Sequence, residues 1–179
     1  MLRRYGLFLE EFDKKLEKYY SAHKDFIRCK KGCTECCEIG EYPFSRLEAE
    51  YIMSGFVHLS PQVQDRIKQN IREVLKTYEA SKNYRCPFLV NSECALYEYR
   101  GIVCRTFGLA YVDKGVVRLP ECVNSGLNYS EIYDKSQKEI TLENPVMENL
   151  MTDKVLRSDI AEKYELECGE IRPLICWFL

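Results

Sequence analysis

The 179-residue sequence has neither an excess of charge nor a long hydrophobic run. It contains 26 Lys and Arg against 28 Asp and Glu, for a formal net charge of −2. A nearly neutral chain gives no electrostatic reason to expect nucleic acid or an anionic membrane as a partner. No stretch approaches the ~18 apolar residues of a membrane span. The apolar run after Arg3 and Arg4 already ends at Glu10, which is too short for a secretory signal, so we expect a cytoplasmic protein.

Glycine-rich nucleotide loops, internal repeats and linkers are also missing. No G-x-G-x-x-G occurs, so no dinucleotide or similar nucleotide site is indicated. With 46% hydrophobic residues the chain can bury one core. We therefore predict a compact single domain spanning residues 1–179.

The pattern of apolar residues and caps predicts a mainly α fold with a small β-hairpin. About four to five helices would surround two cysteine-rich loops. Ser45 with Glu48 forms a capping-box pattern, and Ser60-Pro61 and Asn144-Pro145 each place a capping residue before a proline. The clearest predicted helices span about residues 2–24, 45–55, 60–82 and 144–164, and the hairpin joins 109–112 to 116–119.

Cysteine is the residue in unusual supply, with ten in the chain. Four fall within nine residues as C-x3-C-x2-C-C, four are spread over residues 86–122, and two lie near the C-terminus. In a reducing compartment such a cluster points to metal binding or catalysis rather than to disulfides. Cys168 and Cys176 stand in a more apolar region and are expected to be packed free thiols.

Histidine, by contrast, is scarce, and neither His23 nor His58 lies within a cysteine motif. A metal site in this chain would therefore be mostly or wholly sulfur, which selects zinc, an iron–sulfur centre or Cu(I). Zinc bound by four cysteines would be a closed structural site, whereas an iron–sulfur centre could transfer electrons. Spacing alone does not choose between them.

The first loop contains a metal-binding turn and an adjacent pair. Cys33-Thr34-Glu35-Cys36 brings two thiolates together at a small loop-closure cost. Cys36 and Cys37 are neighbours, and adjacent side chains point apart in most backbone conformations. We therefore expect either that one of the two is not a ligand or that they serve neighbouring metal positions.

Five short motifs follow one another in the middle of the chain. They are Cys33-Thr34-Glu35-Cys36-Cys37, Cys86-Pro87-Phe88-Leu89, Cys94-Ala95-Leu96-Tyr97-Glu98-Tyr99-Arg100, Cys104-Arg105-Thr106-Phe107-Gly108 and Cys122. Together they resemble the YkgJ-type CxxCxxCC cysteine-cluster family, a zinc- or iron-chelating domain. The resemblance covers residues 29–122 and departs from the family pattern in the Cys29–Cys33 spacing and in Gly101, where the family usually has proline.

The resemblance implies a metal-binding region over residues 29–122. Its metal ligands would be Cys29, Cys33, Cys36, Cys37, Cys86, Cys94, Cys104 and Cys122. Residues supporting the ligands would be Arg105, which could donate to a sulfur or form an ion pair, and Glu98 and Arg100, for which a structural salt bridge is favoured.

Three functions stay open at this point. The first is a metal-binding protein that chelates zinc or iron, including iron as an iron–sulfur cluster. The second is an enzyme, because flagellin lysine N-methylases carry a similar cysteine cluster; S-adenosylmethionine would be a cofactor only in this case, and no catalytic residue is identified. The third is a zinc-stabilised interaction module that binds a protein partner.

Overall fold

The computed structural model describes residues 1–142 and 144–179, and helices dominate this part of the chain. The α-helices are α1 (Leu2–Ala22), α2 (Glu35–Glu38), α3 (Arg46–Phe56), α4 (Pro61–Thr77), α5 (Ile102–Thr106), α6 (Thr152–Val155) and α7 (Asp159–Lys163), and three 3-10 helices span Tyr97–Tyr99 (η1), Glu121–Ser125 (η2) and Leu174–Phe178 (η3). The predicted mainly α class is confirmed, but the described residues hold more helices than the four to five expected.

The strands are short and form antiparallel pairs. They are β1 (Pro43–Ser45) with β8 (Ile171–Pro173), β2 (Leu89–Val90) with β3 (Glu93–Cys94), β4 (Tyr111–Asp113) with β5 (Val116–Arg118), and β6 (Tyr133–Asp134) with β7 (Glu139–Ile140). The β4–β5 pair is the predicted hairpin, with Val112 opposite Val117. The β1–β8 pair joins the C-terminal segment to the chain just after the first cysteine loop, with Phe44 opposite Arg172.

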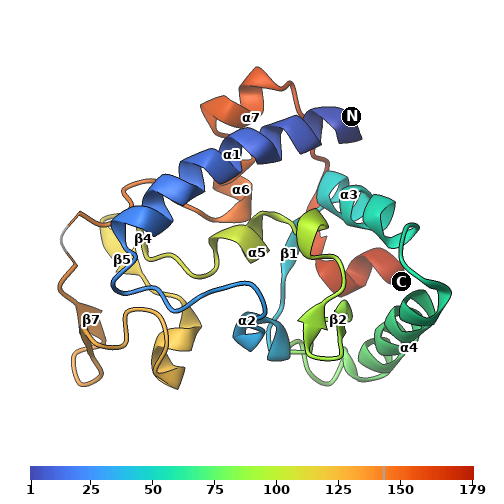
Figure 1. Ribbon diagram of the computed structural model, residues 1–179, viewed down its shortest axis with the longest axis horizontal. Coiled ribbons are helices and arrows are strands. Elements are labelled where there is room, and N and C mark those ends of the chain that lie inside the picture. Colours follow the sequence, from blue (N-terminus) through green and yellow to red (C-terminus); the bar gives the residue numbers. More distant parts are fainter. Residues whose placement is uncertain (143) are drawn as a thin grey trace.

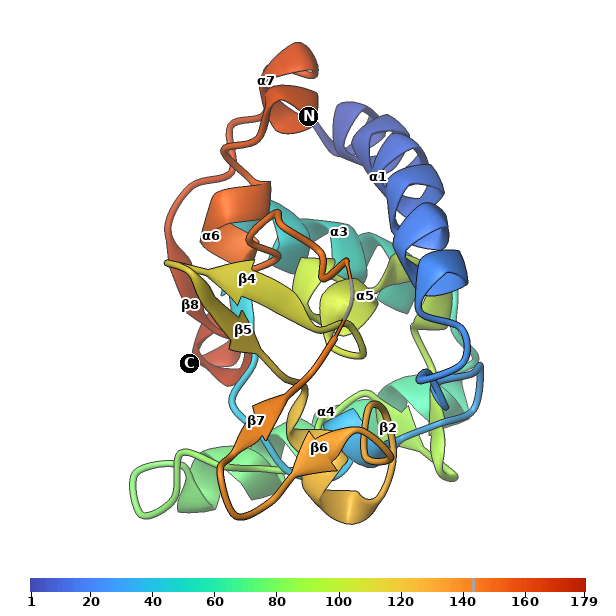
Figure 2. The ribbon, with the colours of Figure 1, turned by 90° about the vertical axis from the view of Figure 1, so that its left-hand side faces the viewer.

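Helix α1 covers one side of the molecule with a single apolar face. Its buried residues are Tyr5, Phe8, Leu9, Phe12 and Leu16, at the spacing of one helical face. They pack in a first core with residues of α3, α5 and α6. Figures 1 and 2 show α1 as a long rod, with α7 beside its N-terminal half.

The two predicted caps are present. In α3 the Ser45 hydroxyl accepts from the Glu48 amide at 3.2 Å, and the Ser45 amide donates to Glu48 Oε2 at 2.8 Å. In α4 the Ser60 hydroxyl accepts a hydrogen bond from the Val63 amide, and Pro61 occupies the first position of the helix. Capping fixed these two starts as expected, although α4 ends at Thr77 rather than near residue 82.

The predicted last helix over residues 144–164 is wrong. Asn144 has a left-handed backbone (φ 55°), and Val146 instead forms a parallel bridge with Tyr111 of β4. Helix formation begins only at Thr152, and the Ser158 hydroxyl caps a separate helix by accepting from the Ala161 amide. Pairing with β4 therefore overrides the local helical signal, and Met147, which lies within the predicted helix, is 73% exposed.

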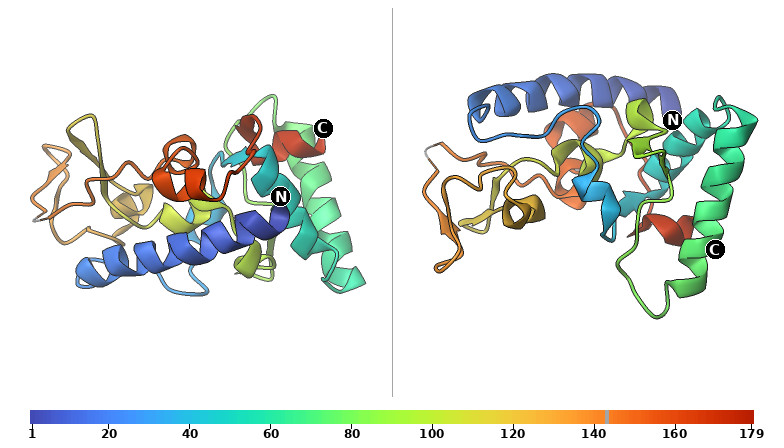
Figure 3. Two further views of the ribbon diagram at one scale, coloured as in Figure 1. Left: turned by 90° about the horizontal axis from the view of Figure 1, so that it is seen from above. Right: turned by 60° about the horizontal axis from the view of Figure 1, so that its bottom comes forward.

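The C-terminal segment docks on a second core, as its apolar sequence predicts. Leu174 and Ile175 are buried there with Phe44, Ile67 and Phe88, among others. Figure 3 shows η3 lying against α4, with the C-terminus beside that helix. None of the helices in the described residues has the length and apolar character needed to cross a membrane.

Candidate metal centre

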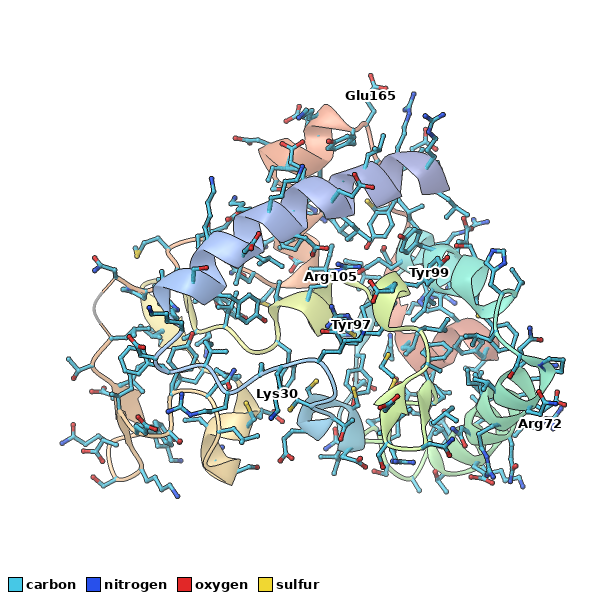
Figure 4. All side chains as sticks on the ribbon, in the orientation of Figure 1. Lys30, Arg72, Tyr97, Tyr99, Arg105 and Glu165 are labelled. Carbon is cyan, nitrogen blue, oxygen red and sulfur yellow. The ribbon has the colours of Figure 1, made fainter. Side chains whose placement is uncertain are left out.

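Cysteines from both loops meet around one small cavity beside the second core. The cavity measures about 60 Å³, and its sulfur-bearing walls are Cys33, Cys36, Cys37, Cys86, Cys94 and Cys104. Figure 4 shows sulfur atoms gathered around α2. Residues 33–37 therefore meet the second cysteine loop in space, although almost fifty positions separate Cys37 from Cys86 in the sequence.

Backbone pairing holds the two loops together. The Cys86 amide donates to the Cys37 carbonyl at 2.8 Å, and Gly40 forms an antiparallel bridge with Tyr84. On the surface, Arg85 pairs with Glu38 at 2.8 Å. These contacts fix α2 next to the start of the second loop without using the thiols themselves.

The adjacent pair Cys36 and Cys37 is closer than the sequence suggested. Helix α2 places the two Sγ atoms 3.9 Å apart, not on opposite sides of the chain. Two ligands of one tetrahedral zinc at about 2.3 Å stand roughly 3.8 Å apart. The pair therefore has the spacing of one edge of such a site. Their shared hydrogen bond raises the pKa of Cys36 and lowers the pKa of Cys37, so Cys37 ionises first.

The three cavity cysteines of the second loop keep their thiols protonated. Burial raises the pKa of Cys86, Cys94 and Cys104, and the Arg100 guanidinium opposes this rise at Cys94 and Cys104. Within residues 1–142 and 144–179, no three His, Cys or acidic side chains already stand where one metal ion would need them. The donor set fits a thiophilic metal in kind, and binding would draw the sulfurs inward as protons leave.

A second group of thiols adjoins this cavity. Burial raises the pKa of Cys122 to about 11, with Cys29 and Cys33 as the neighbouring thiols that add to the rise. Cys122 is carried by η2, which packs against α2. Cys29 is an exposed residue, but partial desolvation of its thiol and the neighbouring Cys33 raise its pKa, against the hydrogen bond from Asn128. Cys33 is therefore both a wall of the six-cysteine cavity and a neighbour of Cys29 and Cys122.

Comparison with known protein families decides what this chain is. A family model described as "CxxCxxCC: Putative zinc- or iron-chelating domain" matches residues 28–123, more than half of the chain. The protein belongs to the CxxCxxCC family. No curated protein and no solved structure matches the chain. The matched range contains all eight cysteines predicted as ligands.

The remaining two cysteines and both histidines lie outside the CxxCxxCC centre. Cys168 packs against the first core, and Cys176 packs against the second core with its Sγ 3.5 Å from the Tyr78 hydroxyl. His23 is buried, with Nδ1 2.9 Å from the Tyr129 hydroxyl. His58 is exposed after α3.

The three charged residues predicted to support the ligands have different surroundings. Arg105 is buried, and its three guanidinium nitrogens donate to the Asp13 carboxylate and to the carbonyls of Arg100 and Glu98. The Glu98 carboxylate is exposed and pairs with Lys31 at 3.5 Å. Arg100 lines the cysteine cavity, and its guanidinium lies 3.5 Å from the centre of the Tyr97 ring.

Asn128 is the supporting residue that the sequence reasoning missed. It is fully buried, and its Nδ2 donates to Cys29 Sγ at 3.1 Å and to the Gly108 carbonyl at 2.7 Å. Its Oδ1 accepts from the amides of Arg28 and Cys29 at 2.7 and 3.1 Å. Asn128 follows the last cysteine motif, and no local pattern in the sequence marks it.

Proposed function

We propose that this CxxCxxCC domain holds zinc or an iron–sulfur centre through thiolates of both cysteine loops. The observation that carries the proposal is the cavity of about 60 Å³ lined by six cysteines from separate segments. The ligands there would be Cys33, Cys36, Cys37, Cys86, Cys94 and Cys104. Cys29 and Cys122 would be further ligands next to Cys33. When bound, zinc would supply structural cross-linking and an iron–sulfur centre would supply electron transfer.

The character of the cavity supports a metal rather than an organic molecule. Organic ligands occupy sites of roughly 300–1,000 Å³, several times larger than this one. The thiols that surround it are the ligand type that zinc and iron–sulfur centres share. Raised pKa values at Cys86, Cys94 and Cys104 mean that binding must release protons, so affinity should increase with pH.

Elemental analysis of anaerobically prepared protein tests the proposal. We expect stoichiometric zinc, or iron with a brown colour and absorbance near 400 nm. Cys37→Ser and Cys94→Ser should lower the metal-to-protein ratio, whereas the matched controls Cys168→Ser and Cys176→Ser should keep it. Equal metal content in all four variants, or none in the wild type, would contradict the proposal.

A chelator provides an independent test of how far the metal supports the fold. Structural zinc contributes on the order of 10 kcal/mol in small sites. Removing it should therefore lower the melting temperature by many degrees. An unchanged melting temperature after complete removal would exclude a structural role. The methylase-like or redox enzyme and the interaction module stay predictions, and calorimetry with S-adenosylmethionine tests the first of them.

A further inference from the structure

A second, larger cavity shares a wall with the cysteine cavity. It measures about 390 Å³, which lies within the range of small-molecule sites. Both cavities are lined by Cys33, Cys36 and Cys104, together with Tyr97 and Arg100. The smaller cavity has room for little more than ions. A molecule that approaches the centre would therefore occupy the larger one.

Basic side chains surround this larger cavity. Four basic residues line the cavity or its rim, namely Lys30, Lys31, Arg100 and Arg105. Two acidic residues, Asp13 and Glu17, line it as well. Two of these cations already have partners, because Arg105 pairs with Asp13 and Lys31 pairs with Glu98. Figure 4 shows Arg105, Tyr97 and Lys30 in sequence from α1 down towards α2.

Arg100 is the cation that is held ready for a ligand. Its Nε donates to the Tyr97 carbonyl at 2.7 Å, and its guanidinium stacks on the ring of the same residue. Among the described residues, no carboxylate forms a salt bridge with it and its two terminal nitrogens have no hydrogen-bond partner. A half-buried guanidinium fixed in one orientation is suited to bind a carboxylate or phosphate through two parallel hydrogen bonds.

The rest of the cavity favours an anion with an apolar or planar body. Tyr20, Tyr97, Phe107 and Leu16 contribute aromatic and aliphatic surface to its walls. We propose that this cavity binds a small organic anion, a carboxylate or phosphate, with its charged group on Arg100 and its body against these side chains. This binding site goes beyond the proposed metal centre and uses side chains that are in place without a metal.

Titration calorimetry at low ionic strength, with phenyl phosphate and benzoate as probes, tests the site. The protein is the full chain with its metal content measured beforehand. We expect at least one probe to bind with a dissociation constant of about 1 mM or lower. Arg100→Gln should weaken binding ten-fold or more, because charge-assisted hydrogen bonds are lost. Lys30→Gln, at the rim, should weaken it only a few-fold.

Arg72→Gln is the matched control, since Arg72 lies on α4 at the right-hand edge of the view in Figure 4, away from Arg105, Tyr97 and Lys30 near its centre. It should bind the probe as the wild type does. If Arg100→Gln fails to fold by circular dichroism, Arg100→Lys replaces it and should retain weaker binding. Absence of binding in the wild type, or equal binding in the wild type and the Arg100 variant, would overturn the proposal.

The two proposals fail separately. If the wild type as prepared contains no metal but binds phenyl phosphate through Arg100, the metal centre is rejected and the anion site is kept. If the wild type contains stoichiometric metal but binds neither probe, the anion site is rejected and the metal centre is kept. Loss of metal on Arg100→Gln, with no anion binding by the wild type, would assign Arg100 as the counter-ion of the thiolates.

Discussion

Replacing Asn128 should destabilise the protein and loosen the start of the cysteine region. Its side chain joins three segments, because it bonds the amides of Arg28 and Cys29, the Gly108 carbonyl and Cys29 Sγ. Asn128→Ala would remove all four bonds. The Gly108 carbonyl is buried and would then lack a protein partner, which costs about 1–3 kcal/mol.

The two amides are partly accessible, so water can replace some of what they lose. Together we expect Asn128→Ala to cost about 2–4 kcal/mol, a large share of the roughly 5–15 kcal/mol that stabilises a typical domain. Urea unfolding followed by circular dichroism gives this number. Gln62→Ala, at an exposed position of α4, is the control and should change the stability by no more than about 0.5 kcal/mol.

The variant Asn128→Asp isolates the two bonds donated by Nδ2. It keeps an oxygen for the amides of Arg28 and Cys29 but turns a second oxygen towards the Gly108 carbonyl and the Cys29 sulfur. It should be destabilised at neutral pH and partly recover in acid, where a protonated carboxyl can donate. If Asn128→Ala and Asn128→Asp both match the wild type in urea, the reasoning about this residue is refuted.

Two further predictions concern α5, which carries Cys104. Gly101→Ala should cost about 1–3 kcal/mol in urea unfolding, because its Cβ would lie 2.8 Å from Glu48 Oε1 and from Phe44 Cε1, both in buried side chains; an unchanged midpoint would contradict this. Burial raises the pKa of Glu48, so its stabilising contribution is complete below about pH 4.3 and is lost as the pH rises through the folded-state value. Between about pH 4.3 and the folded-state pKa of Glu48, the free energy of unfolding of the wild type should therefore fall, and that of Glu48→Gln should not show this fall. Parallel pH profiles for the two proteins would argue against this.

Capping residues in the sequence predicted where α3 and α4 begin. Ser45 and Ser60 mark the starts of α3 and α4 because their hydroxyls satisfy amides of the first helical turn. The helices α2 and α5 are only four and five residues long, too short to show a periodicity. They form because their neighbours hold them. Contacts with a neighbouring element also explain why the predicted C-terminal helix does not form at its start, since Val146 pairs with Tyr111 of β4.

The sequence predicted the site in composition but not in geometry. The motif series marked eight cysteines, and six of them line one cavity in the structure, while their role as metal ligands stays a prediction. It did not predict that one helical turn would bring Cys36 Sγ and Cys37 Sγ to 3.9 Å. For Arg105 the sequence left open a bond to a sulfur or an ion pair. The structure shows the ion pair, with Asp13 of α1, together with two bonds to backbone carbonyls of the preceding turn.

Gly101, where the family usually has proline, has a structural reason in this chain. Its φ of −72° is one that proline also adopts, so the turn conformation does not require glycine. The space beside it does, because the Glu48 carboxylate and the Phe44 ring fill the volume that a Cβ would need. Glu48 Oε1 accepts from the Ile102 amide at 2.8 Å, so an acid from α3 satisfies the first turn of α5. The missing side chain at 101 thus admits the carboxylate that fixes the helix carrying Cys104, and the departure from the family motif preserves the placement of a proposed ligand.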